Sequence, residues 1–196
     1  LAESQATLEK AHAIAEKVAP ETTLVGRILR QQAEAAVKSG NFRLAQRFAS
    51  KALPIMGSNG DRVTCGALWK LKAIICSATD QIEAMKTAMN KALDLLTEAG
   101  VRYELADALL AAGQLPGFGP RQRLTYLFRA EEYFASAGMS ARLGEVQAAI
   151  AAIDSTAPYG AAAIPSRGRD SEAADYITCC PEIEKFKSQL SAFGRT

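Results

Sequence analysis

The sequence contains one histidine and one tryptophan, and it lacks an apolar run long enough to span a bilayer. His12 is the only imidazole that a catalytic Ser–His–Asp or Cys–His set could use. It lies between Glu9 and Glu16 on an expected helix surface, where a solvated side chain is the ordinary role. We therefore expect no catalytic residues, no metal site and no cofactor in this chain.

The sequence also lacks a large excess of basic or acidic residues. The chain has 23 basic and 21 acidic residues, so it lacks the basic stripe with which nucleic-acid-binding domains neutralise phosphates. The opening residues 1–4 have a helix-like composition and no basic-then-apolar signal peptide. There is no initiator Met, as in a piece of a longer polypeptide. We expect no direct nucleic-acid binding and no membrane binding.

The four cysteines do not form a disulfide pattern. Cys65 and Cys76 lie in one apolar run, where free thiols act as small core groups. Cys179 and Cys180 are adjacent, which is poor geometry for pairing with each other. This usage predicts a reduced, cytoplasmic protein.

A repeat of about forty residues organises the chain. A basic residue, Ala and then apolar positions recur at Lys10-Ala11, Lys51-Ala52, Lys91-Ala92 and Arg129-Ala130. The basic residues 10, 51, 91 and 129 are separated by 41, 40 and 38 positions. Between these phrases lie other segments with apolar residues at helical spacing. We therefore predict an all-α fold of antiparallel helix-pair repeats.

Breaks in the apolar pattern give the expected helix bounds. Asp61 is a good N-cap, and Gly100 and Gly138 suit helix C-caps. The Gly-rich residues 113–120 lack the Gly-Lys-Ser/Thr ending of a phosphate loop and read as a turn. Besides an opening helix, the predicted helices are 22–38, 42–56, 62–78, about 80–100, 101–112, 120–137 and 140–153.

Small residues recur where two helices would pack closely. Ala45, Ala49, Ala88 and Ala92 are expected to be buried at helix–helix contacts. This pattern resembles the tetratricopeptide (TPR) family, in the longer, divergent form found in bacterial signalling proteins. The positions that carry the resemblance are Gly40, Ala45, Phe48, Ala52, Gly113 and Phe134. The resemblance implies a TPR-like α-solenoid over residues 1–154.

Three basic residues are candidates for a binding groove. Arg27, Arg30 and Lys70 lie on first helices of successive pairs, and residues 30 and 70 are forty positions apart. First helices line the groove of tetratricopeptide arrays, so the resemblance implies a groove for an acidic protein or peptide. A solvated charged face is the alternative. Trp69 and the aromatic residues Tyr126, Phe128, Tyr133 and Phe134 are expected to pack in the core.

A change of composition follows the repeats. Residues 155–175 are rich in Ala, Ser, Gly and Pro, which predicts a flexible linker. Residues 176–196 then read as a new helix with Pro181 in its first turn. Its apolar stripe has no partner in the expected array, which favours self-association: Ile183, Phe186, Leu190 and Phe193.

The tail resembles the entry to the AAA+ module of bacterial sigma-54-dependent transcription activators. Ile177, Cys180-Pro181, the following apolar helix and Gly194-Arg195-Thr196 match that entry, whereas Thr178 stands where Gly is usual. The resemblance implies that Ile177 and Thr178 border an incomplete adenine pocket, and that ATP and Mg²⁺ bind only in the full-length protein. It also implies that this chain neither hydrolyses ATP nor binds an enhancer.

Two functions follow from these resemblances. The first is a regulatory, signal-sensing domain that binds a protein partner and relays that binding through the linker to a downstream ATPase. The alternative is a general tetratricopeptide scaffold module of another multidomain bacterial regulator. An enzyme is disfavoured, because no catalytic constellation is present in the sequence.

Overall fold

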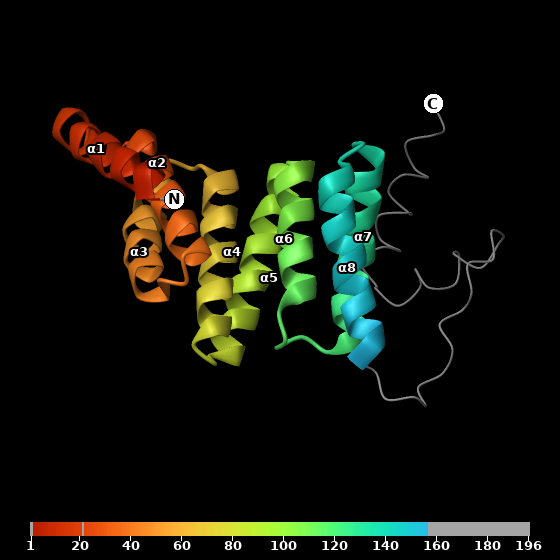
Figure 1. Cartoon of the computed structure of the whole chain (residues 1–196). Helices are drawn as coiled ribbons and strands as arrows, with labels where there is room; N and C mark the ends of the chain where they lie inside the picture. The colour runs from red at the N-terminus through yellow and green to blue at the C-terminus, as the bar shows by residue number, and fades with distance from the viewer. Residues whose placement is uncertain (1, 21, 157–196) are drawn as a thin grey trace, which may run out of the picture. The chain divides into compact units, whose positions relative to one another are not determined.

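The structure describes residues 2–20 and 22–156, and this part of the chain contains eight α-helices (Figure 1). The structure is a computed structural model. That part contains no strand, which confirms the all-α prediction. The helices are α1 (Ala2–Val18), α2 (Thr23–Lys38), α3 (Phe42–Ser58), α4 (Arg62–Ala78), α5 (Ile82–Ala99), α6 (Arg102–Gln114), α7 (Pro120–Ser136) and α8 (Ser140–Thr156).

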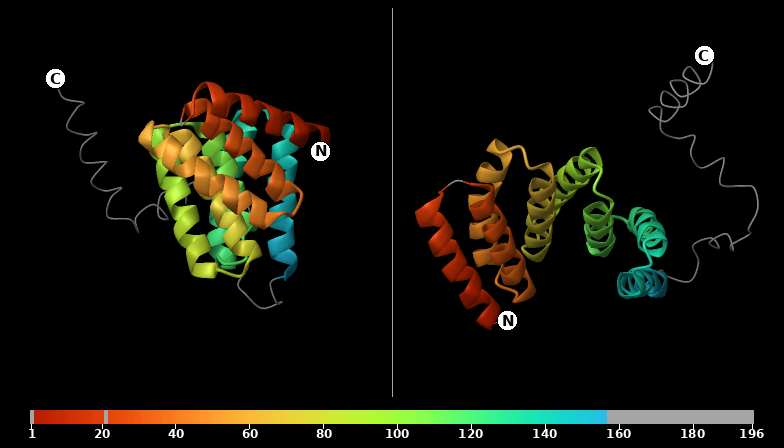
Figure 2. Two further views of the ribbon diagram at one scale, coloured as in Figure 1. Left: turned by 90° about the vertical axis from the view of Figure 1, so that its left-hand side faces the viewer. Right: turned by 90° about the horizontal axis from the view of Figure 1, so that it is seen from above.

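The period of about forty residues is present in the helix positions. The first helices α2, α4, α6 and α8 begin at residues 23, 62, 102 and 140, at intervals of 39, 40 and 38 residues. The helices that alternate with them, which we call second helices, are α1, α3, α5 and α7, and they begin at residues 2, 42, 82 and 120. Three hairpins, α2–α3, α4–α5 and α6–α7, pack most closely, and each packs against the next (Figure 2). The chain is therefore a helical repeat of antiparallel pairs.

Local sequence signals set the helix ends. The Asp61 carboxylate accepts a hydrogen bond from the Thr64 amide at 2.9 Å, so it caps α4 as predicted. Gly100 ends α5 with φ +68°, a conformation that L side chains rarely adopt. The predicted start of α5, at about residue 80, is two residues too early. Asp80 takes a left-handed conformation, φ 57°, in the turn, so the helix begins only at Ile82.

Small residues allow the two helices of a pair to approach. The four predicted alanines, Ala45, Ala49, Ala88 and Ala92, are at most 1% exposed. The first helices also carry small residues at these contacts. A Cβ added to Gly66 of α4 would lie 2.6 Å from Leu96 Cγ of α5, so Leu96 packs directly on the α4 backbone. Gly26 receives Met56 in the same way, forty positions earlier. This repeated contact joins α2 to α3 and α4 to α5.

Gly113 has a different position from the one the family resemblance implies. It lies inside α6 rather than between helices, because α6 continues to Gln114. A Cβ there would meet Leu127 Cγ at 2.4 Å, so this glycine too is a site of close helix packing. The turn that follows is partly core, since Leu115 and Phe118 are buried.

The predicted bounds of the last helix, the linker and the tail can be compared with the structure only as far as the end of α8. This helix reaches Thr156, three residues past its predicted end, and so includes the first two residues of the predicted linker. The rest of the linker and the tail, with Ile177 and Thr178, lie outside the described residues. None of the described helices is long and apolar enough to cross a membrane.

Candidate functional site

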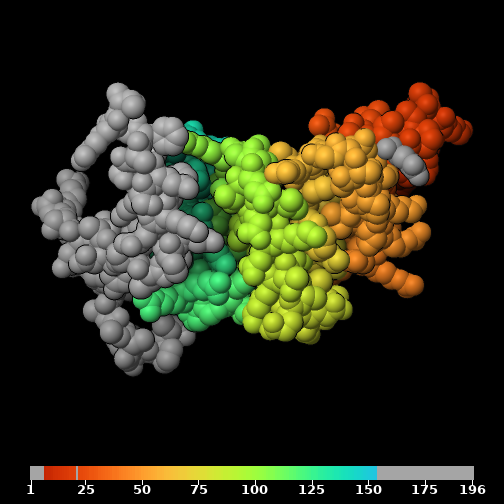
Figure 3. Space-filling model, turned by 180° about the vertical axis from the view of Figure 1, so that it is seen from behind, coloured from red at the N-terminus to blue at the C-terminus, as the bar shows by residue number. Residues whose placement is uncertain are grey.

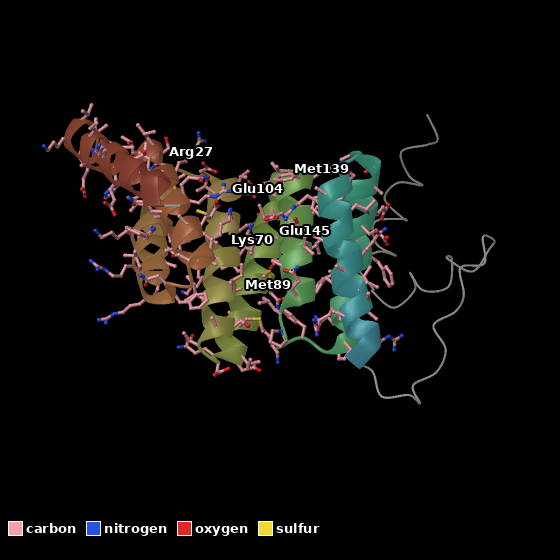
Figure 4. The ribbon with its side chains drawn as sticks, in the orientation of Figure 1. Arg27, Lys70, Met89, Glu104, Met139 and Glu145 are labelled. Atoms are coloured by element: carbon pink, nitrogen blue, oxygen red, sulfur yellow. The ribbon has the colours of Figure 1, made fainter. Side chains whose placement is uncertain are left out.

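The first helices α2, α4, α6 and α8 share one side of the repeat, which we call the first-helix face. Each of these helices touches the next one in the series. Charged side chains from all four meet there, and Figure 4 labels three of them, Lys70, Glu104 and Glu145. We call the whole set the ionic network: Arg30 and Glu34 of α2, Lys70 of α4, Glu104 and Asp107 of α6, and Arg142 and Glu145 of α8.

Arg30 joins two helices that are not neighbours. Its Nε donates to Glu34 at 2.8 Å, and its Nη2 donates to Glu104 at 3.0 Å. Glu34 belongs to the same helix, whereas Glu104 belongs to α6, beyond α4. The ion pair between Arg30 and Glu104 therefore connects α2 with α6 across α4 on the first-helix face.

Asp107 is the centre of the second half of the network. Its carboxylate forms ion pairs with Lys70 of α4 and with Arg142 of α8. Arg142 also pairs with Glu145 at 2.6 Å, and its guanidinium lies 5.5 Å from the centre of the Phe134 ring. The Asp107 and Lys70 side chains are only 19% and 10% exposed. One carboxylate thus compensates two cations in a poorly solvated place.

Burial and the neighbouring carboxylates have opposite effects on the pKa values of Arg30 and Lys70. For Arg30, burial lowers the pKa, but the hydrogen bond and charge of Glu34, with those of Glu104, outweigh it and raise the pKa. For Lys70, burial is the largest effect and lowers the pKa, although Glu104 and Glu34 attract its charge. Lys70 therefore depends on its carboxylate partners to stay charged in this site.

A groove opens on the first-helix face between α2 and α4. Its volume is about 400 Å³, and it is lined by Arg27, Arg30, Gln31, Asp61, Val63 and Thr64. Arg27 is 67% exposed and holds Asp61 at 3.4 Å, the loosest ion pair of this face. Burial raises the pKa of Asp61, but hydrogen bonds from Thr64 and Arg27 outweigh this and lower it. The groove thus offers one poorly engaged guanidinium beside polar and apolar walls.

The three basic residues predicted to line a groove have different surroundings. All three lie on first helices, as the repeat predicted, and Arg27 and Arg30 line the same groove. Arg30 and Lys70, however, are already paired with acids of α2 and α6. An incoming acidic group would therefore meet Arg27 first.

Sequence patterns did not reveal the acidic half of this site or its α8 cation: Glu34, Glu104, Asp107, Arg142 and Glu145. Glu34 and Glu145 lie four and three residues after their basic partners, but the pairs between helices join residues up to 74 positions apart, which no local motif connects. One available signal was Lys70 itself, a cation flanked by the apolar residues Leu68 and Leu71 within α4. A buried cation requires a carboxylate, and the repeat places α6 next to α4.

One aromatic prediction, that for Phe128, is wrong. Trp69 packs against the core as predicted, with its ring half-buried, and Lys72 and Lys91 Nζ lie 4.5 and 4.3 Å from its ring centre. Phe128 is 48% exposed, whereas Phe134 in the same helix is 1% exposed. The two side chains point to different sides of α7 because six residues correspond to about 600° along a helix, well short of two full turns.

The described residues hold no group of three or more His, Cys, Asp or Glu side chains that could bind a metal ion. The charged side chains of the first-helix face form ion pairs and hydrogen bonds with one another. Cys65 and Cys76, the two cysteines in the described range, are buried free thiols. The sequence matches no protein-family model, no curated protein and no solved structure.

Proposed function

We propose that this chain is a regulatory, TPR-like protein-binding domain of a bacterial sigma-54-dependent transcription activator that acts in the cytoplasm. The domain binds a protein or peptide partner and passes that event to an ATPase module in the same polypeptide. The proposal joins the helical repeat to the resemblance of the tail to the entry of that module.

The observation that carries the binding role is the groove between α2 and α4 on the first-helix face. Arg27 is 67% exposed there, and it holds Asp61, which is 15% exposed, only at 3.4 Å. A pair of this kind contributes about 0–1 kcal/mol, so a carboxylate of a bound peptide can replace Asp61 at small cost. Val63 and the polar Gln31 and Thr64 supply further contacts for a peptide.

The ionic network supports a route from this groove to the end of the repeat. Arg30 lines the groove and also pairs with Glu104 of α6. Three positions after Glu104 on α6, Asp107 holds α4 and α8 through Lys70 and Arg142. A ligand that draws Arg30 toward itself alters the charge balance beside Asp107, and so biases the contact between α6 and α8.

The test of the family assignment is the coding sequence that follows the codon for Thr196. We expect a Gly-x-x-x-x-Gly-Lys-Ser/Thr phosphate loop within a few tens of codons, because that loop follows the segment which the tail resembles. ATP and Mg²⁺ would then be ligands of the whole protein. A stop codon, or a continuation without such a loop, contradicts the assignment and favours a general scaffold module.

A further inference from the structure

The hairpin α2–α3 carries far more positive charge than the rest of the chain. Residues 22–60 contain six basic residues and a single acid, Glu34, while the whole chain has a net charge of only +2. Arg27 and Arg30 of this group are paired on the first-helix face. The surplus therefore comes from the other basic residues, which lie at the end of α2 and along α3.

Three of these form what we call the α3 basic stripe: Arg43, Arg47 and Lys51. They are exposed and spaced four residues apart, so they follow one side of α3 in steps of about 6 Å. None of them forms an ion pair with any described residue, and α3 contains no acid. Like charges at this spacing destabilise a helix, so the stripe does not serve the stability of α3.

The surroundings of the stripe suit a protein more than a nucleic acid. A shallow hollow of about 400 Å³ lies at its start, lined by Asn41, Arg43, Leu44 and Arg47. Asn41 is already engaged as the cap of α3, so the hollow offers two guanidinium groups and an apolar wall. No aromatic side chain stands exposed on α3 for base stacking, since Phe42 and Phe48 pack toward the core.

The stripe lies on a second helix, apart from the groove of the first-helix face. Seen from behind, α5 in yellow-green and α3 in orange form much of the surface, and side chains of α3 extend outward (Figure 3). We propose that the α3 basic stripe is a docking surface for an acidic helix of a partner protein. The carboxylates of that helix, also spaced four residues apart, pair with Arg43, Arg47 and Lys51 in register. This surface is additional to the groove and does not depend on the sigma-54 assignment.

The experiment uses the full chain and a labelled Ala-rich helical peptide with three Glu residues at four-residue spacing. A peptide with Gln at the same positions and a labelled oligo-dT strand are the comparison probes. We expect fluorescence anisotropy to show binding of the Glu peptide that weakens with added salt and is at least about tenfold tighter than that of the other probes. Equal binding of the Gln peptide, tighter binding of oligo-dT, or no binding overturns the proposal.

The variant Arg47→Glu separates binding from folding. It should weaken binding of the Glu peptide at least about tenfold, since it places a like charge in the middle of the stripe. Its melting temperature should stay equal or rise, because Glu at position 47 gains opposite charges four residues away on both sides. Arg129→Glu, an exposed arginine of α7, is the matched control and should bind like the parent. Equal weakening by both variants indicates only a general charge effect and contradicts a specific site.

Discussion

Replacing Asp107 with Ala is expected to lower the free energy of unfolding by about 3–5 kcal/mol. The reason is that one carboxylate compensates both Lys70 and Arg142, and Lys70 is buried. Urea denaturation followed by circular dichroism measures the loss. Glu98→Gln is the matched control, because the pair of Glu98 with Arg62 is more than half exposed and contributes about 0–1 kcal/mol.

The loss in Asp107→Ala should depend on pH with a defined sign. Burial already holds the pKa of Lys70 below its ordinary value. Asp107 pairs with Lys70, and removing this negative charge should lower that pKa further. Between this depressed pKa and the unfolded value of about 10.4, the unfolded state binds more protons, so stability rises with pH. Because the parent's Lys70 pKa is lowered less, the defect should shrink as the pH rises from the pKa of Lys70 in the variant to its pKa in the parent. A defect that is constant with pH, or that equals the Glu98→Gln effect, contradicts the buried-charge account.

Replacing Phe134 with Ala is expected to lower the free energy of unfolding by about 3–5 kcal/mol. Phe134 is 1% exposed, packs edge-on against Tyr103 at 6.4 Å between ring centres, and lies under the Arg142 guanidinium. The substitution leaves a cavity and also removes the cation–π contact that helps to hold Arg142 near Asp107.

The control for this prediction is in the same helix. Phe128 is 48% exposed, so Phe128→Ala should cost less than about 1 kcal/mol. Equal losses in the two variants would mean that the sides of α7 are assigned wrongly. Since both substitutions have the same effect on helix propensity, their difference measures the burial of Phe134 together with its contacts to Tyr103 and Arg142.

The helix positions could be predicted from the sequence because their causes are local. Asp61 and Gly100 act through their own hydrogen bonds and dihedral angles, and the alanines at 45 and 92 act through their own size. At Asp80 the local signal did not give the correct start of α5. The same residue type is a good helix cap and also tolerates the left-handed conformation, and only the folded turn decides between them.

The candidate site could be predicted only in part. The forty-residue spacing correctly put Arg30 and Lys70 on first helices, but it could not show that acids already pair with them. Glu34 lies on α2 itself, whereas Glu104 and Asp107 lie on α6, 74 and 37 positions from their basic partners. These distant pairs are set by packing between helix pairs, which no single repeat encodes. The α3 basic stripe, by contrast, is a four-residue pattern that sequence inspection alone could have found.

Our central proposal is that the helical repeats regulate an ATPase module in the same polypeptide. The most direct measurement is ATP hydrolysis by the complete protein translated from the reading frame that contains this chain, compared with the same protein lacking residues 1–154. We predict hydrolysis in both proteins, with rates that differ about fivefold or more, the usual range of allosteric coupling. Absence of hydrolysis, or equal rates with and without residues 1–154, would contradict the account.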